Sequence, residues 1–180
     1  MTDEASAPKG DATTDASLHG AVIAGVIPDQ SPRVLKEAAR YAKLFQAPLV
    51  VVHVDVTRFV TYEDPDGYVH SAPIDMNIAG GEGELTKVQD AAAAVLGGDF
   101  PQPWTVRQLV GDPAMAIKHF ADEIDARLLV VGTRKRGFGE SVREFFTGSV
   151  GARLAHRQHR SILIVPLGEP VPDDEEIWPA

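Results

Sequence analysis

The sequence predicts an open α/β fold in which five parallel strands form one sheet with helices on both faces. Short apolar runs alternate along the chain with runs whose apolar residues recur at helical spacing. Runs such as Pro48–Val56 are rich in β-branched apolar residues and lack a regular polar alternation, which is typical of strands buried on both faces. The chain has 180 residues and is 44% hydrophobic, which is enough for one core.

The first half predicts strand, helix, strand, loop and helix. The strands and helices are expected at Ala21–Ile27, Val34–Phe45, Pro48–Val56 and Leu85–Leu96, in that order. Asp29 and Ser31-Pro32 supply the start signals of the first helix. Thr61–Glu84 is crowded with Gly, Pro and Asp and lacks periodicity, so we expect a long loop there.

The second half predicts strand, helix, strand, helix and strand. These elements are expected at Trp104–Val110, Ala114–Ile124, Arg127–Gly132, Ser149–Gln158 and Ser161–Val165. Asp112-Pro113 caps and begins the first of these helices, and Pro166 stops the last strand.

The composition predicts one domain with two tails. Residues 1–18 are small, polar and aperiodic, which indicates a disordered leader, and residues 168–180 form an acidic, proline-rich tail around a domain at 19–167. No run approaches the roughly 20 apolar residues of a membrane span, so we expect a cytoplasmic protein. The absence of cysteine excludes disulfides and thiolate metal sites.

The net charge of −9 argues against binding of nucleic acid or acidic membranes by the whole surface. Basic residues nevertheless outnumber acidic ones between Arg127 and Arg160. This segment is either a solvated basic face or part of a site for an anion.

Ligands of open parallel sheets bind beyond the carboxyl ends of the strands. Asp29, Val110-Gly111 and Gly132 stand at such predicted ends. Gly148-Ser149 begins a helix, where free amides and a hydroxyl can bind a phosphate, although Ser149 is equally suited to be a plain helix cap.

Three stretches carry a resemblance: "VIPDQSP", "VGDPAMAI" and "VVGTRKRGF…TGSVGARLAHRQHRSILIVP". Over roughly residues 20–166 the chain resembles the universal stress protein family. The resemblance implies a Rossmann-like fold, similar to the adenine nucleotide alpha hydrolases, and ATP binding through the pattern G-x2-G-x9-G-S/T. Carried over, the pattern begins at Gly132 and ends at Gly148-Ser149. Lys135 takes the place of the second glycine, and the loop is three residues longer than in the family.

We expect the nucleotide site to combine strand ends, the glycine loop and the helix start after it. Its residues are Ile27, Pro28, Asp29, Val54, Val110, Gly111, Val131, Gly132, Lys135, Gly137, Gly148, Ser149 and Val150. Asp29 would accept from ribose hydroxyls and hold Mg²⁺ through water, or would instead only cap its helix. Val54 and Val110 would flank the base, or would only belong to the core. Lys135 would meet the phosphates of ATP as a cation.

No nucleophile and base are apparent, and four of the six histidines, His53, His119, His156 and His159, lack the spacing of a metal site. We therefore expect a regulatory nucleotide-binding module with slow ATP hydrolysis at most. A related nucleotide-activating enzyme would need an HxGH- or SGGxD-like loop after the first strand, and "VIPDQSP" is neither. The alternative is a dimeric scaffold without nucleotide that contacts an acidic partner through its basic loop and helix.

The last strand, Ser161–Val165, predicts a homodimer. A short apolar strand at a sheet edge leaves backbone groups unpaired. Family members pair their last strands across a two-fold axis, and the resemblance implies the same here. The alternative is that this strand is buried within the monomer.

Overall fold

The main sheet of the protein has five parallel strands in the order β5-β2-β1-β6-β7. The computed structural model describes residues 16–63, 69–73, 82–133 and 150–168. The strands are β1 (Val22–Gly25), β2 (Leu49–Asp55), β5 (Trp104–Val110), β6 (Leu128–Gly132) and β7 (Ser161–Val165). The prediction of a five-stranded parallel sheet is confirmed.

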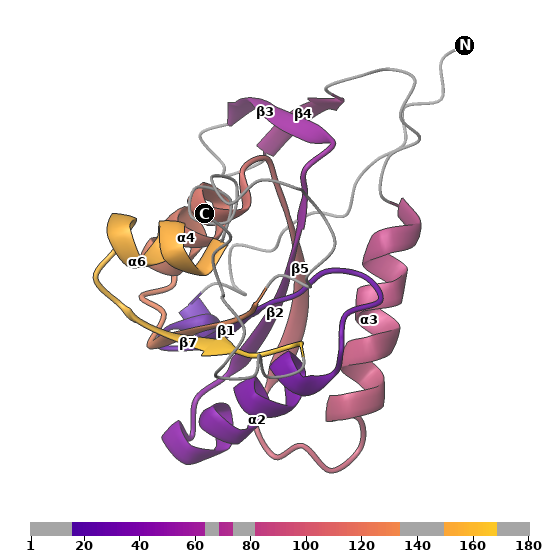
Figure 1. Cartoon of the computed structure of the whole chain (residues 1–180), viewed down its shortest axis with the longest axis vertical. Coiled ribbons are helices and arrows are strands. Elements are labelled where there is room, and N and C mark those ends of the chain that lie inside the picture. The colour runs from indigo at the N-terminus through magenta and orange to yellow at the C-terminus, as the bar shows by residue number, and fades with distance from the viewer. Residues whose placement is uncertain (1–15, 64–68, 74–81, 134–149, 169–180) are drawn as a thin grey trace, which may run out of the picture.

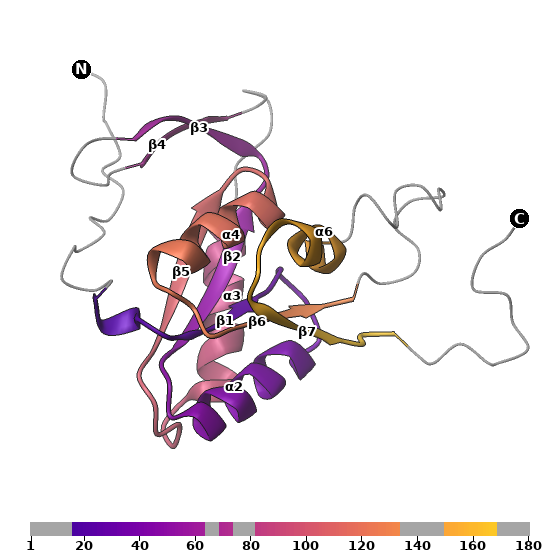
Figure 2. The same cartoon turned by 90° about the vertical axis from the view of Figure 1, so that its left-hand side faces the viewer.

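Helices cover both faces of this sheet, as predicted (Figures 1 and 2). The helices are α2 (Arg33–Phe45), α3 (Glu82–Leu96), α4 (Pro113–Glu123) and α6 (Val150–Arg157). One core lies between the sheet and α2 and α3, and a second lies between the sheet and α4 and α6. Successive strand residues alternate between the two cores, so that Val22 belongs to the first and Ile23 to the second. Among the described residues, no helix has the length and apolarity to cross a membrane.

Strand burial follows position in the sheet. Every residue of the inner strand β2 is buried, which explains why its sequence is largely apolar and does not alternate. β7 lies at one edge, and Ile164 on it is 47% exposed. Burial of the last strand within the monomer is therefore incomplete.

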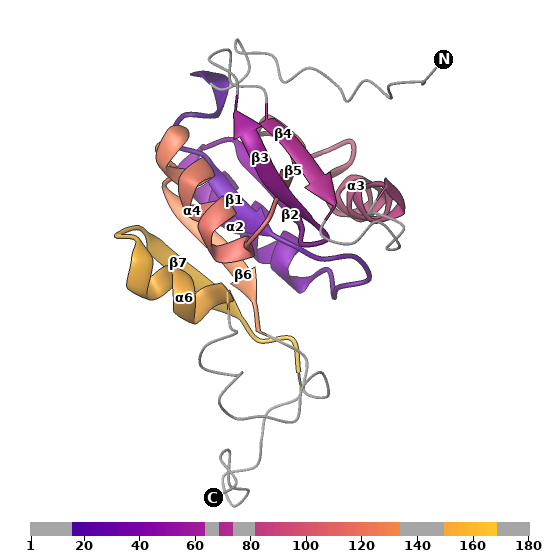
Figure 3. The ribbon, with the colours of Figure 1, turned by 90° about the horizontal axis from the view of Figure 1, so that it is seen from above.

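A β-hairpin occupies part of the segment Thr61–Glu84, where the sequence predicted only a loop. β3 (Arg58–Glu63) and β4 (Val69–Pro73) pair antiparallel and lie beyond the end of β2 in Figure 1, while Figure 3 shows the two strands side by side from above. Arg58 joins them, because its Nε donates to the Ser71 hydroxyl at 2.9 Å. The loop prediction was wrong here because β3 leaves Val60 and Tyr62 about half exposed, so its sequence lacks the apolar alternation of a packed strand.

The two helices for which the sequence predicted start signals, α2 and α4, differ in their N-terminal caps. Asp112 caps α4 as predicted, since its Oδ1 accepts from the Met115 amide at 3.0 Å and Pro113 follows it. The N-cap of α2 is Pro32, which has no side-chain cap. Asp29 therefore does not cap α2, and that alternative for its role was wrong.

The described chain begins with a short 3-10 helix, η1 (Ala16–Leu18), which lies within the expected leader. Leu18 is 4% exposed and belongs to the core beneath α4. The Ala21 amide donates to the Leu18 carbonyl at 3.0 Å. Leu18 thus packs with the domain.

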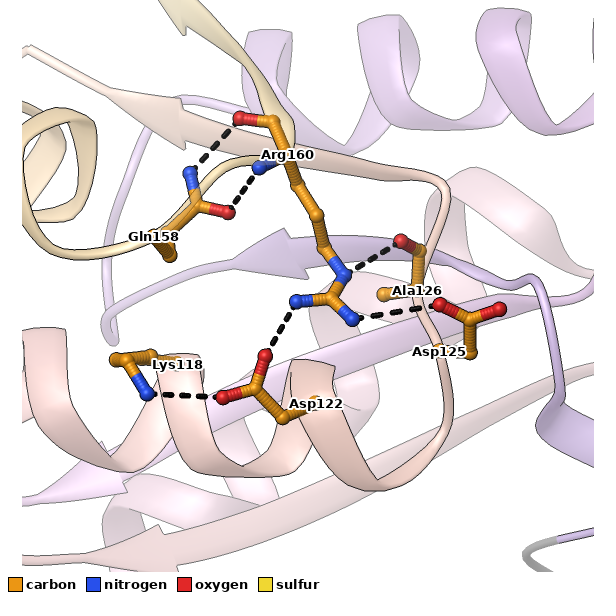
Figure 4. Close-up of polar contacts among 6 residues, drawn as sticks. All are labelled: Lys118, Asp122, Asp125, Ala126, Gln158 and Arg160. Carbon is orange, nitrogen blue, oxygen red and sulfur yellow. Dashed lines mark hydrogen bonds and ion pairs between the residues drawn. The ribbon is translucent and has the colours of Figure 1, made fainter.

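Arg160 ties the start of β7 to the end of α4 (Figure 4). Its Nε donates to the Ala126 carbonyl at 2.9 Å, and its guanidinium also pairs with Asp122 and Asp125. Its side chain is 8% exposed. Gln158 completes the anchor, because its side chain bonds both the amide and the carbonyl of Arg160. The edge strand is therefore held by a buried cation as well as by its ladder to β6.

Candidate functional site

The carboxyl ends of all five strands lie at one edge of the sheet, because the strands are parallel. β1 has β2 on one side and β6 on the other. The helix after β1 covers one face, and α6, the next described helix after β6, covers the opposite face. The connections therefore diverge between β1 and β6, where open α/β sheets bind their ligands.

Asp29 lies in the connection that follows β1. Its backbone is left-handed, with φ of 57°, a conformation that aspartate adopts more readily than most residues. Its side chain is 76% exposed, and Oδ2 accepts from Nζ of Lys87 on α3 at 3.0 Å. In the same connection, Ile27 is also largely exposed, and Pro28 is half-buried. The carboxylate is thus available to a ligand at the strand ends.

Gly132, the last residue of β6, lies against this same connection. The Ile27 amide donates to Gln30 Oε1 at 3.2 Å, which holds the Gln30 side chain. A Cβ on Gly132 would lie 2.5 Å from Gln30 Nε2 and 2.5 Å from Leu167 Cδ1. A larger residue at this position would therefore push aside the ends of these two side chains, which pack close to the Gly132 backbone without any ligand.

Gly111 begins the connection that follows β5. Its amide donates to the Asp55 carbonyl at 3.0 Å, which joins the ends of β5 and β2. Gly111 has φ of 101°, which other residues rarely adopt. No described atom beyond its chain neighbours lies within 4 Å of a Cβ built on it. Val110 before it is half-buried. The part of the chain that the structure describes therefore leaves space beside Gly111.

Of the remaining predicted site residues, some pack in or against the core and the others lie outside the described residues. Val54 and Val131 are 9% and 4% exposed and belong to the core beneath α4 and α6. Val150 begins α6 and packs against that core. The other four lie outside the described residues: Lys135, Gly137, Gly148 and Ser149.

Contacts from α3 were missed by the sequence analysis. Nε2 of the buried His53 lies 3.3 Å from Glu84 Oε2, although the two atoms are not aligned as a hydrogen bond. His53 Nδ1 lies 3.4 Å from the Val26 carbonyl. Together with the Asp29–Lys87 pair, this contact places the first turns of α3 beside the carboxyl edge. No sequence signal indicates the pairing of Lys87 with Asp29, because the two residues are 58 positions apart.

α6 is held by a second ion pair. Arg153 NH1 and NH2 donate to the two carboxylate oxygens of Asp112 at 2.6 and 2.8 Å. These hydrogen bonds hold the pKa of Asp112 below its usual value, with a smaller contribution from the Met115 amide. The pair joins the start of α4 to α6.

Two further features bear on what the site can hold. Within the described ranges, no three His, Asp or Glu side chains come together as a metal site would require. A shallow pocket of about 320 Å³ lies at the amino edge of the sheet, with Pro48 and Arg127 in its lining. It is therefore on the opposite side from Asp29 and Gly111. Open α/β sheets bind their ligands at the carboxyl edge, where those two residues lie.

The model of the universal stress protein family matches residues 21–166. The chain belongs to the universal stress protein family. The resemblance stated above is thereby confirmed. No curated protein matches this universal stress protein.

Solved universal stress proteins share its fold. One from Archaeoglobus fulgidus is 22% identical, with a TM-score of 0.54, over 82% of this chain and 98% of its own. A universal stress protein in complex with cAMP is 27% identical, with a TM-score of 0.53, over 84% and 99% of the two chains. The Archaeoglobus fulgidus protein in complex with dAMP is 20% identical, with a TM-score of 0.51, over 82% and 98%.

Proposed function

We propose that this universal stress protein is a regulatory module that binds an adenine nucleotide, ATP in the first instance, at the carboxyl edge of its sheet. The observation that carries the proposal is the exposed Asp29 carboxylate at the divergence between β1 and β6. The relative in complex with cAMP, at 27% identity, supports the class of ligand. A cytoplasmic location remains a prediction from the sequence.

In this proposal Asp29 accepts from the ribose hydroxyls through carboxylate oxygens. The base lies near Val110-Gly111, where the described residues leave space. The phosphates lie toward Gly132, Lys135 and Gly148-Ser149, with Mg²⁺ as a further ion near Asp29. The chain's own part is binding and orientation.

The test is calorimetric titration of the whole protein with ATP, AMP and cAMP, preceded by mass spectrometry for nucleotide that co-purifies. Asp29→Asn should weaken ATP binding about tenfold, or about 1.4 kcal/mol, because a neutral amide replaces two carboxylate acceptors. Gly148→Asp should abolish it by placing a negative charge beside the phosphates. Asp99→Asn, at an exposed position between α3 and β5 on the opposite edge of the sheet, is the matched control and should bind as wild type. Wild-type protein that binds none of the three nucleotides at millimolar concentration would refute the proposal.

The second candidate is the dimeric scaffold that contacts an acidic partner. One observation favours it: Gln30 and Leu167 occupy the space over Gly132 in the absence of any ligand. The same titration decides between the two candidates, because a scaffold would dimerise without binding nucleotide.

Pairing of β7 through Ser161–Val165 is part of both candidates. The strand lies at the sheet edge, and its Ile164 is 47% exposed. Light scattering tests this assembly independently of the nucleotide.

A further inference from the structure

We propose that Lys87 of α3 belongs to the nucleotide site, where it positions the Asp29 carboxylate and offsets its charge. The site would then favour phosphorylated adenine nucleosides over uncharged adenosine. This inference rests on the proposed function and adds to it a residue that decides between classes of ligand.

The contact itself is direct. Lys87 Nζ donates to Asp29 Oδ2 at 3.0 Å, and the two side chains are 57% and 76% exposed. An ammonium group has three N–H donors, so Lys87 can bond Asp29 and still offer donors to a ligand. The other carboxylate oxygen of Asp29 is left for a ribose hydroxyl. The pair and the ligand therefore do not exclude one another.

The position of Lys87 is set by its helix. Val88 and Ala92 of α3 are 2% and 0% exposed and pack in the core against the sheet. Glu84, one turn before Lys87, lies 3.3 Å from the buried His53 of β2. Residues three apart share one face of a helix, so Glu84 and Lys87 present the same face of α3 to the carboxyl edge. Figure 1 shows α3 beside the connection from β1 to α2.

Charge gives the pair its effect on selectivity. An unpaired Asp29 carboxylate at the ribose would repel the phosphates of a nucleotide and would have no such effect on adenosine. The Lys87 ammonium cancels this repulsion at close range. Because both groups are exposed, water and salt weaken the effect, so a change of severalfold is expected.

The experiment titrates ATP, AMP and adenosine into the full-length wild type, Lys87→Met, Lys87→Arg and the control Lys36→Met at low salt. Lys36 is an exposed lysine of α2. Lys87→Met should weaken ATP binding about fivefold and adenosine binding by less than about twofold. AMP should fall between them, Lys87→Arg should restore most of the affinity, and Lys36→Met should match wild type.

A double-mutant cycle tests whether Lys87 acts through Asp29. The variant with both Asp29→Asn and Lys87→Met should bind ATP within about twofold of Asp29→Asn alone, because interacting residues are not additive. Fully additive losses would overturn the positioning role. Equal losses for ATP and adenosine, or unfolding of Lys87→Met, would mark the pair as structural and overturn the charge role.

The two proposals fail in distinguishable ways. If the wild type binds ATP and Lys87→Met binds it equally well, the inference about Lys87 is wrong and the proposed function stands. If the wild type binds no adenine nucleotide, both are wrong.

Discussion

Replacing Arg160 by alanine should destabilise the domain more than replacing any exposed arginine. The Arg160 side chain is 8% exposed, and its Nε donates to the Ala126 carbonyl at 2.9 Å (Figure 4). Ala126 itself is 3% exposed. Removal of the guanidinium therefore leaves a carbonyl without this donor in a place that water reaches poorly.

The magnitude follows from those contacts. A buried acceptor that loses its donor costs about 1–3 kcal/mol, and loss of the packed aliphatic stem adds to this. Asp122 contributes little, because it is 42% exposed and keeps Lys118 at 2.9 Å. We expect a loss of about 3 kcal/mol for Arg160→Ala, and about half of that for Arg160→Lys, which keeps the charge without the planar fork.

Thermal unfolding followed by circular dichroism measures the effect. About 3 kcal/mol corresponds to a Tm about 6–12 °C lower in a chain of this size. The matched control is Arg157→Ala on α6, whose exposed guanidinium donates a weak hydrogen bond to the Met115 sulfur at 3.8 Å. This change should alter stability by less than about 0.5 kcal/mol. If Arg160→Ala has the same Tm as Arg157→Ala, the buried hydrogen bonds of Arg160 do not stabilise the fold to the expected extent.

Three further predictions concern acid stability, the amino-terminal boundary and assembly. The lowered pKa of Asp112 stabilises the fold above the unfolded value of 3.8 and ceases to do so as pH falls through the folded pKa. Arg153→Met should thus lower the free energy of unfolding by about 1 kcal/mol at pH 7. In urea unfolding, the difference in this free energy between Arg153→Met and wild type should become smaller below pH 3.8. A difference that stays constant with pH would contradict this prediction. A chain that starts at residue 16 should have the same Tm as the full chain. A chain that starts at residue 19 lacks Leu18, and its free energy of unfolding should be about 2 kcal/mol lower. An equal Tm for the two shortened chains would place Leu18 outside the core. Ile164→Glu should convert a dimer to a 19.3 kDa monomer in light scattering, and a wild type that is already monomeric would refute pairing through β7.

The sequence predicted the elements and their class because hydrophobic periodicity is a local property of the chain. Trp104–Val110 and Ser161–Val165 were predicted at the bounds that the structure has. The Asp112 cap was predictable for the same reason, since its partner amide at Met115 is three residues away. The hairpin β3–β4 was missed because its exposed ribbon gives no apolar alternation.

The sequence placed Asp29 and Gly132 at strand ends, and the fold has both at the carboxyl edge, Gly132 at the end of β6 and Asp29 in the connection after β1. What surrounds them was not predictable from the sequence. Asp29 pairs with Lys87 rather than capping its helix, and the side chains of Gln30 and Leu167 pack over Gly132.

Only the tertiary structure decided these contacts, together with the strand order and the burial of Arg160. The partners of each are distant in sequence: Lys87 lies 58 residues from Asp29, and Arg160 lies 38 from Asp122. Local patterns determine which residues form a strand or helix and which face is apolar. Which polar side chains then meet depends on the order in which the strands pair and the side on which each helix crosses, and no single segment of the chain encodes that order.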